Sequence, residues 1–157
     1  MTTAAEQATA PTVVNGRVIA LAHHAARALL EGVLDRHGAT FHHSVTLRVV
    51  DVAGGSIARD ELVRDVIGSL KVEESVVRGV VEELTTAQLL EAEQTEVSRL
   101  RLTDAGRELY ERTTAETAEI TTRLYADIPA GDLAVAGRVL ALVTQRANAE
   151  PAATRGV

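Results

Sequence analysis

The sequence predicts a mainly α-helical domain that carries one small β-hairpin. Stretches near both ends of the chain place apolar residues at three- and four-residue steps, which is the spacing of one face of a helix. Residues 97–102 (VSRLRL) instead alternate between two sides, which is the spacing of a strand. The 157 residues suffice for one domain with its own core. Because only 2% of them are aromatic, that core must consist of Val, Leu, Ile and Ala.

Two helices are expected in the first third of the chain. Apolar residues predict a helix over 13–35, and Gly38 lies just beyond its end, where glycine is favoured. A second, shorter helix is predicted over 41–53, where about half of the residues are apolar. The glycine pair at 54–55 is expected to stop it.

The central part of the chain is expected to hold two further helices and the hairpin. Ser56 is a favourable N-cap for a helix over 57–70, and a fourth helix is predicted over 73–86. Two extended segments follow, over 89–92 and 97–102, and the polar residues between them form the hairpin tip.

Two long helices are predicted toward the C-terminus. Thr103 caps the first, which is expected to run to about Asp127, and Pro129 separates it from the last, over 131–147. The terminal segments are rich in small and polar residues, which predicts a disordered lead over 1–12 and a disordered tail over 149–157.

Composition excludes several classes of protein. The absence of cysteine rules out disulfide frameworks, cysteine-ligated zinc and thiol catalysis. No apolar run approaches the ~18 residues of a membrane span, and the N-terminus lacks a basic-then-apolar signal pattern. A cytoplasmic protein without a membrane partner is therefore expected. The net charge of −6 also argues against broad, sequence-independent binding of nucleic acid.

The order of these elements, three short helices and a hairpin between long flanking helices, resembles the MarR family of winged helix-turn-helix regulators. The most specific residues are Leu102-Thr103-x-x-Gly106, at the junction where the wing of that family leads into a helix. The resemblance covers about residues 13–148. It implies a winged helix-turn-helix lobe over 38–102 and a helical dimerisation region formed by residues 13–37 and 103–148.

The resemblance also implies partners and a function. MarR-like proteins are homodimers that bind a palindromic operator, and many respond to a small, often aromatic or phenolic effector in a crevice beside the DNA-binding lobe. A transcriptional regulator of this kind is therefore expected. The side chains expected to contact DNA are Arg59, Lys71, Ser75, Arg78, Arg99 and Arg101.

The predicted DNA-facing segment is unusually acidic for such a role. Residues 73–84 contain four carboxylates and one cation, and residues 56–102 carry ten anions against six cations. The wing tip, residues 93–96, also lacks the Asp-x-Arg element of typical family members. Two interpretations follow. Either the cations form a modest track for DNA while the carboxylates point aside, or the fold persists without operator binding and serves to bind or transform a small molecule.

All five histidines fall within residues 23–43, where a MarR-like fold places its effector crevice. The side chains expected to bind the effector are His23, Arg27, His42, His43 and Arg48. Two alternatives stay open, namely purely structural histidines and a zinc or haem site, although no two histidines are four residues apart. No cofactor is predicted. No phosphate loop or nucleophile elbow indicates an enzyme, which leaves recruited acid–base chemistry as a minor alternative.

Overall fold

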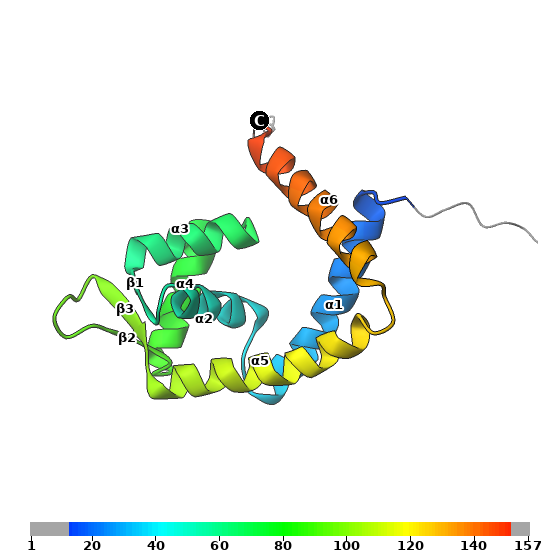
Figure 1. Ribbon diagram of the computed structural model, residues 1–157. Helices are drawn as coiled ribbons and strands as arrows, with labels where there is room; N and C mark the ends of the chain where they lie inside the picture. The colour runs from blue at the N-terminus through cyan, green and yellow to red at the C-terminus, as the bar shows by residue number, and fades with distance from the viewer. Residues whose placement is uncertain (1–12, 152–157) are drawn as a thin grey trace, which may run out of the picture. The chain divides into compact units, whose positions relative to one another are not determined.

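The computed structural model describes residues 13–151, and within them the chain forms six helices and three short strands (Figure 1). The elements are α1 (Gly16–Arg36), α2 (Phe41–Val52), β1 (Ser56–Ala58), α3 (Arg59–Leu70), α4 (Glu74–Thr86), β2 (Leu90–Ala92), β3 (Arg99–Leu102), α5 (Asp104–Leu124) and α6 (Ala130–Ala149). They divide into two compact units, the first ending at Ala118 and the second beginning at Glu119. The predicted lead and most of the predicted tail lie outside the described residues. The predicted mainly helical fold class is confirmed.

The boundaries of the second unit differ a little from the prediction. α5 ends at Leu124 rather than near Asp127, and Pro129 occupies the N-cap of α6, as its helix-breaking role predicts. α6 then continues to Ala149, so the described part of the predicted tail begins as helix.

The sheet contains a strand that the sequence prediction missed. β1, β3 and β2 pair in that order and all pairs are antiparallel, with Ile57 opposite Leu100 and Leu90 opposite Leu102. The prediction that Ser56 caps a helix from Ile57 is therefore wrong. The three residues of β1 are too few to show alternation, and they are extended because β3 offers them hydrogen bonds and Ile57 a buried position.

Side-chain hydrogen bonds at the N-caps determine where α1 and α2 begin. The Asn15 side chain accepts a hydrogen bond from the Val18 backbone at 3.1 Å, so α1 starts three residues later than predicted. At α2 the Thr40 hydroxyl accepts from the His43 backbone at 3.2 Å. After α2 the chain turns through Gly54 and Gly55, whose φ angles of 88° and 90° favour glycine. The predicted stop at this glycine pair is confirmed.

The core lies where α2, α3 and α4 pack against one another and against the sheet. α4 contributes an apolar face to it, formed by Val77, Val80, Val81 and Leu84. The fully buried side chains are aliphatic except for Thr46, as expected for a chain with so few aromatic residues. The largest of them are Leu34, Leu47, Leu62, Leu84, Leu90 and Leu100. This packing fixes α3 and α4 relative to each other and leaves their outer faces to solvent.

The junction between the wing and α5 is unusually close. The Thr103 hydroxyl accepts a hydrogen bond from the Gly106 backbone at 3.0 Å, and the Thr103 backbone donates to the Leu89 carbonyl at 3.2 Å. A Cβ atom added to Gly106 would lie 2.0 Å from that same carbonyl oxygen. Only glycine fits here, which explains the glycine of the Leu102-Thr103-x-x-Gly106 motif.

We predict that Gly106→Ala destabilises the protein, because the obstructing atom belongs to the backbone and cannot turn aside. The free energy of unfolding should fall by about 1–3 kcal/mol, the usual range for overpacking, even though alanine favours a helix. Urea unfolding followed by circular dichroism measures this change.

The matched control is Gly79→Ala in α4, where an added Cβ has no atom within 4 Å. This variant should gain about 0.5–1 kcal/mol from its higher helix propensity. Equal stability changes at the two positions would contradict the close-contact explanation.

Candidate nucleic-acid interface and ligand groove

The helix α3, the turn 71–73 and the helix α4 form a helix-turn-helix, and the hairpin of β2 and β3 extends from the same lobe as a wing (Figure 1). Lys71 makes the turn sharp by adopting the left-handed conformation, with φ 56° and ψ 38°. The outer face of α4, which includes Glu74, Ser75 and Arg78, is exposed. This arrangement defines the class of the domain, a winged helix-turn-helix that helices precede and follow along the chain.

The structure brings most of the predicted DNA-contacting residues onto this lobe. Arg59 begins α3 and lines a small cavity of about 50 Å³ together with Arg78. Lys71 and Ser75 lie exposed at the turn and in the first turn of α4. Among the described residues, neither Arg59 nor Lys71 forms an ion pair. These two cations are therefore available to a phosphate group.

Arg78, the one cation on α4, is already engaged. Its guanidinium lies 2.6 Å from the carboxylate of Glu74, one helical turn earlier, and 3.8 Å from that of Asp60 at the start of α3. The nitrogen Nε also donates to Glu74 at 2.7 Å.

The two arginines of the wing lie within β3 and not at the hairpin tip. Arg101 forms an ion pair with Glu91, its cross-strand neighbour. Arg99 donates to the Ser56 carbonyl at 3.2 Å and to the Ser56 hydroxyl at 3.3 Å, and it lies 4.0 Å from the Glu93 carboxylate. Three of the predicted DNA-contacting arginines thus have carboxylate partners in the protein.

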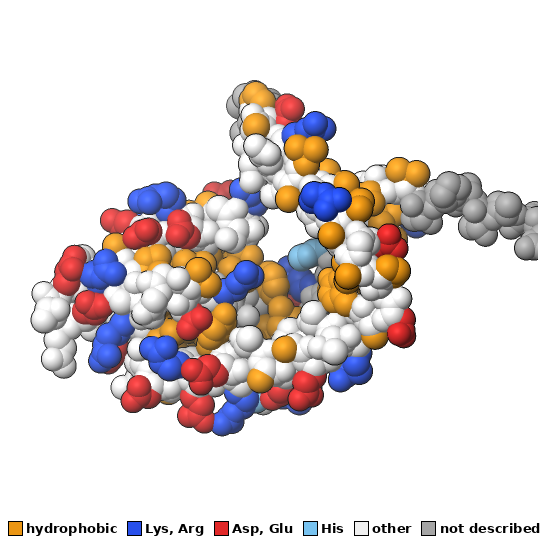
Figure 2. Space-filling model, viewed as in Figure 1, with side chains coloured by type: hydrophobic (Ala, Val, Ile, Leu, Met, Phe, Trp, Pro, Cys, Tyr) orange, Lys and Arg blue, Asp and Glu red, His pale blue; other side chains and the backbone are white. Residues whose placement is uncertain are grey.

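A groove of about 740 Å³ runs between α2 and α3, within the usual size range of small-molecule sites. Figure 2 shows apolar side chains gathered between these helices, with Lys or Arg side chains beside them. Its apolar lining comprises Phe41, Val45, Val49, Val52, Ala53, Ile57 and Leu70. Arg48 and Arg64 also line it, and neither forms an ion pair with any residue in 13–151. Glu61 and Asp65 line it too, so two available guanidinium groups and two carboxylates lie beside the apolar wall. The guanidinium groups suit the acid group of a ligand with an apolar body.

Of the five residues predicted to bind an effector, Arg48 lines this groove. The prediction missed Arg64, although Glu61, Arg64, Asp65 and Gly68 have the spacing of one helix face and all line the groove. Arg27 does not line the groove, but it lies 4.3 Å from the centre of the Phe41 ring, which does, and 2.8 Å from Glu31.

His23 and His42 do not line the groove. The rings of His23 and His24 contact each other on α1, with centroids 5.4 Å apart, and the His42 ring lies 6.4 Å from that of Phe41. Their predicted role in effector binding stays a prediction.

His43 has a clear structural role. Its Nδ1 accepts the Thr40 backbone N–H at 3.2 Å, so the neutral ring must carry its proton on Nε2. Nε2 then donates to the Glu83 carboxylate at 2.8 Å, which ties the start of α2 to α4. Both ring nitrogens are therefore occupied. A ligand at His43 would have to displace one of these bonds, and the predicted role of His43 in effector binding stays a prediction.

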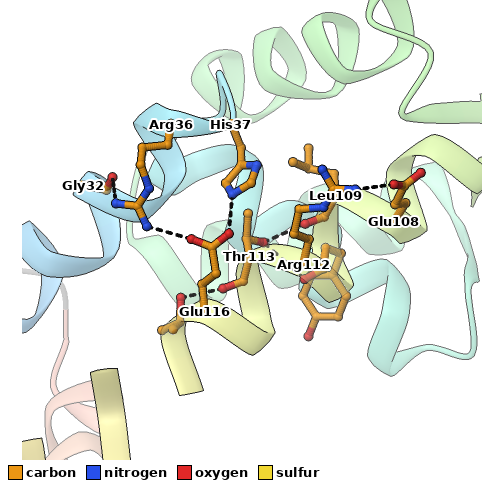
Figure 3. A network of polar contacts seen from close by, with 10 residues as sticks. Gly32, Arg36, His37, Glu108, Leu109, Arg112, Thr113 and Glu116 are labelled. Atoms are coloured by element: carbon orange, nitrogen blue, oxygen red, sulfur yellow. Dashed lines mark hydrogen bonds and ion pairs between the residues drawn. The ribbon is translucent and has the colours of Figure 1, made fainter. Parts of the chain in front are cut away.

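His37 forms a second link, which the prediction did not single out. Glu116 of α5 accepts from Arg36 at 2.7 Å and lies 2.7 Å from His37 Nε2, so one carboxylate holds the end of α1 (Figure 3). The hydrogen bond from Arg36, followed by that from His37, lowers the pKa of Glu116 below its ordinary value of 4.5.

Within residues 13–151, no three histidine, aspartate or glutamate side chains come close enough to hold a metal ion. The zinc alternative thus lacks a ligand set in this part of the chain, and haem binding stays a hypothesis. In the same residues no helix is long and apolar enough to cross a membrane.

No family model and no curated protein matches the sequence. The solved structures, in contrast, contain many similar folds. A MarR-family transcriptional regulator from Rhodococcus sp. RHA1 is 16% identical with a TM-score of 0.68, over 82% of this chain and 91% of that one. NadR in complex with 4-hydroxyphenylacetate is 17% identical with a TM-score of 0.69, over 85% and 96%.

A third similar structure concerns regulation of DNA binding of BpsR from Bordetella bronchiseptica by 6-hydroxynicotinic acid. It is 20% identical with a TM-score of 0.65, over 86% of this chain and 99% of that one. Together these likenesses establish that the chain has the winged-helix fold of the MarR family. The resemblance read from the order of elements is confirmed for the fold.

We predict that Glu116→Gln lowers the thermal midpoint at neutral pH, because it removes the charge shared by Arg36 and His37. The lowered pKa of Glu116 means that the unfolded chain binds more protons than the native protein just below pH 4.5. This contribution is present above that pH and is lost as the pH falls through the lowered pKa. The stability difference between wild type and variant should therefore shrink on acidification.

Thermal unfolding between about pH 7 and about pH 3 measures this difference. The control is Glu111→Gln on the same helix, an exposed carboxyl with no ion pair among the described residues. Its effect on the midpoint should be small across the range. A Glu116→Gln effect that stays constant down to the lowest pH would contradict the ion-pair explanation.

Proposed function

We propose that this protein is a small-molecule-responsive transcriptional regulator of MarR type, acting in the cytoplasm and binding a palindromic operator as a homodimer. The observation that carries this proposal is the outer face of α4, which lies exposed beside a three-stranded wing in a fold shared with known MarR-family regulators. In this architecture a recognition helix of this kind enters the major groove. The proposal requires no metal or cofactor.

Exposed apolar residues on the flanking helices support the homodimer. Leu21 and Leu29 are exposed on α1, and so is Val14 just before its N-cap. α6 has no buried residue, and Val135, Val139 and Val143 lie at four-residue steps along it. Apolar rows of this kind mark interaction surfaces. A second copy of the chain is the partner we propose for them.

The groove between α2 and α3 is the proposed effector site. The ligands named for NadR and BpsR are both hydroxylated aromatic acids, and an anion of this size suits the apolar wall with Arg48 and Arg64. α3 forms one wall and is also the first helix of the helix-turn-helix. A ligand that prefers one position of α3 would shift the population of lobes that fit the operator.

A second candidate function is supported by a different observation. Because Arg78, Arg99 and Arg101 are paired with carboxylates, the lobe offers few available cations to DNA. A protein of the same fold that binds, or transforms, a small molecule in the groove without binding DNA fits this feature.

We predict that the protein shifts the DNA upstream of its own gene at low salt and that Lys71→Ala and Arg59→Ala each weaken this binding. Each of these cations is free to contact one phosphate in each protomer, so each variant should reduce the salt slope of log K for the homodimer by about 1.8, twice the value for one contact. Fluorescence anisotropy over a salt series measures affinity and slope together, and light scattering reports the mass of the complex.

Arg123→Ala is the control, because it removes an exposed arginine outside the lobe. It should leave both affinity and slope unchanged. If Arg123→Ala weakens DNA binding as much as Lys71→Ala and Arg59→Ala do, the result would argue against a specific interface. Absence of a sequence-specific shift even at low salt would refute the regulatory function and leave the second candidate.

We predict that 4-hydroxyphenylacetate or 6-hydroxynicotinate, used as probes, binds the protein and that Arg48→Gln weakens this binding about tenfold or more. The reason is the loss of a charge-assisted hydrogen bond to the carboxylate. Isothermal titration calorimetry measures the change, and Arg123→Gln serves as the control with an unchanged Kd. Equal affinity of wild type and Arg48→Gln would place the effector outside the groove.

A further inference from the structure

We infer that Glu74, Glu91 and Glu93 limit DNA affinity by occupying the arginines that would otherwise bind phosphate. Each carboxylate stands in for a phosphate group against Arg78, Arg101 or Arg99. This inference rests on the proposed function, since it concerns how tightly the lobe binds DNA. It assigns the acidic side chains of the DNA-facing surface a role of their own.

The contact at Arg78 shows the competition most directly. Glu74 and Arg78 are one turn apart on the exposed face of α4, and the carboxylate oxygen Oε1 receives both Nε and Nη2 of the arginine, at 2.7 and 2.6 Å. The same two nitrogens would be needed for a bidentate contact to a phosphate or a guanine. Asp60, 3.8 Å from Arg78, adds a second negative charge from α3.

The two arginines of the wing are also paired with carboxylates, but one is held more firmly than the other. Arg101 and Glu91 are register partners on β3 and β2, and their side chains pair across the strands. Arg99 is held more firmly, because it donates to the hydroxyl and the carbonyl of Ser56. The Ser56 hydroxyl in turn donates to Glu93. Arg101 is thus the wing arginine more easily released.

These contacts are weak enough to be exchanged. The partners are substantially exposed, and exposed ion pairs contribute little to stability because water and salt screen them. An arginine that leaves its carboxylate for a phosphate also leaves a negative charge beside the DNA, which recruits a cation from solution. DNA binding should therefore be weaker, and depend less steeply on salt, than the number of arginines on the lobe suggests.

The test compares Glu74→Gln and Glu91→Gln with Glu73→Gln in the full-length protein. Glu73 precedes Glu74 at the start of α4 and forms no ion pair with any residue in the described part of the chain, so its variant changes the same charge without releasing an arginine. Glu74→Gln and Glu91→Gln should each raise DNA affinity about two- to fivefold and steepen the salt slope of log K by about 1.8, since each releases one arginine in each protomer. Glu73→Gln should leave the slope unchanged.

Arg78→Gln and the double variant Glu74→Gln/Arg78→Gln complete a cycle that isolates the pair, and Glu74→Gln should bring no gain in affinity when Arg78 is already Gln. If Glu73→Gln and Glu74→Gln have equal effects, or the double variant retains the gain, the inference is overturned while the regulatory function stands. If neither the wild type nor any variant binds DNA at low salt, the regulatory function itself fails and the inference with it. Binding by the carboxylate variants but not by the wild type would support the inference that the carboxylates occupy the arginines, while it would refute the regulatory function of the wild type and favour the second candidate.

Discussion

The close approach of α5 to the backbone at Leu89 is the constraint on which the wing depends. Because Gly106 has no side chain, α5 begins directly against the segment that leads from α4 into β2. The Thr103 hydroxyl caps α5 and also donates to the Gln88 carbonyl at 2.7 Å, so one residue fixes the helix start and the entry to the hairpin. The sheet, the recognition helix and α5 therefore meet at a single junction.

How much of the molecule the sequence could predict follows from the range of the interactions involved. The helices and the cap at Thr103 depend on neighbours within a few residues, and they were predicted correctly within a few residues at their ends. β1 was missed because its three extended residues depend on pairing with β3, about 43 positions away. The link from Arg36 and His37 to Glu116 joins residues 80 and 79 positions apart, so no local pattern could reveal it.

For the candidate sites, the sequence predicted the positions of the residues but not the contacts that their side chains make. The sequence correctly located the cations on the lobe, since their helix and strand positions follow from periodicity. Whether those cations are available could not be predicted, because it depends on which carboxylate each side chain meets. Arg78 and Glu74 have the i, i+4 spacing of a helix pair, but the pair of Arg101 and Glu91 requires the strand register. The net charge of −6 thus does not show that some of the carboxylates form ion pairs with arginines.

The position of α3 connects the two proposed sites. One face of α3 carries Arg64 and Asp65 into the groove, while Asp60 in its first turn faces Arg78 of the recognition helix. Because the core fixes α3 against α4, a ligand that moves α3 would move α4 with it. In the proposed mechanism, effector binding therefore acts on DNA affinity through the position of α4.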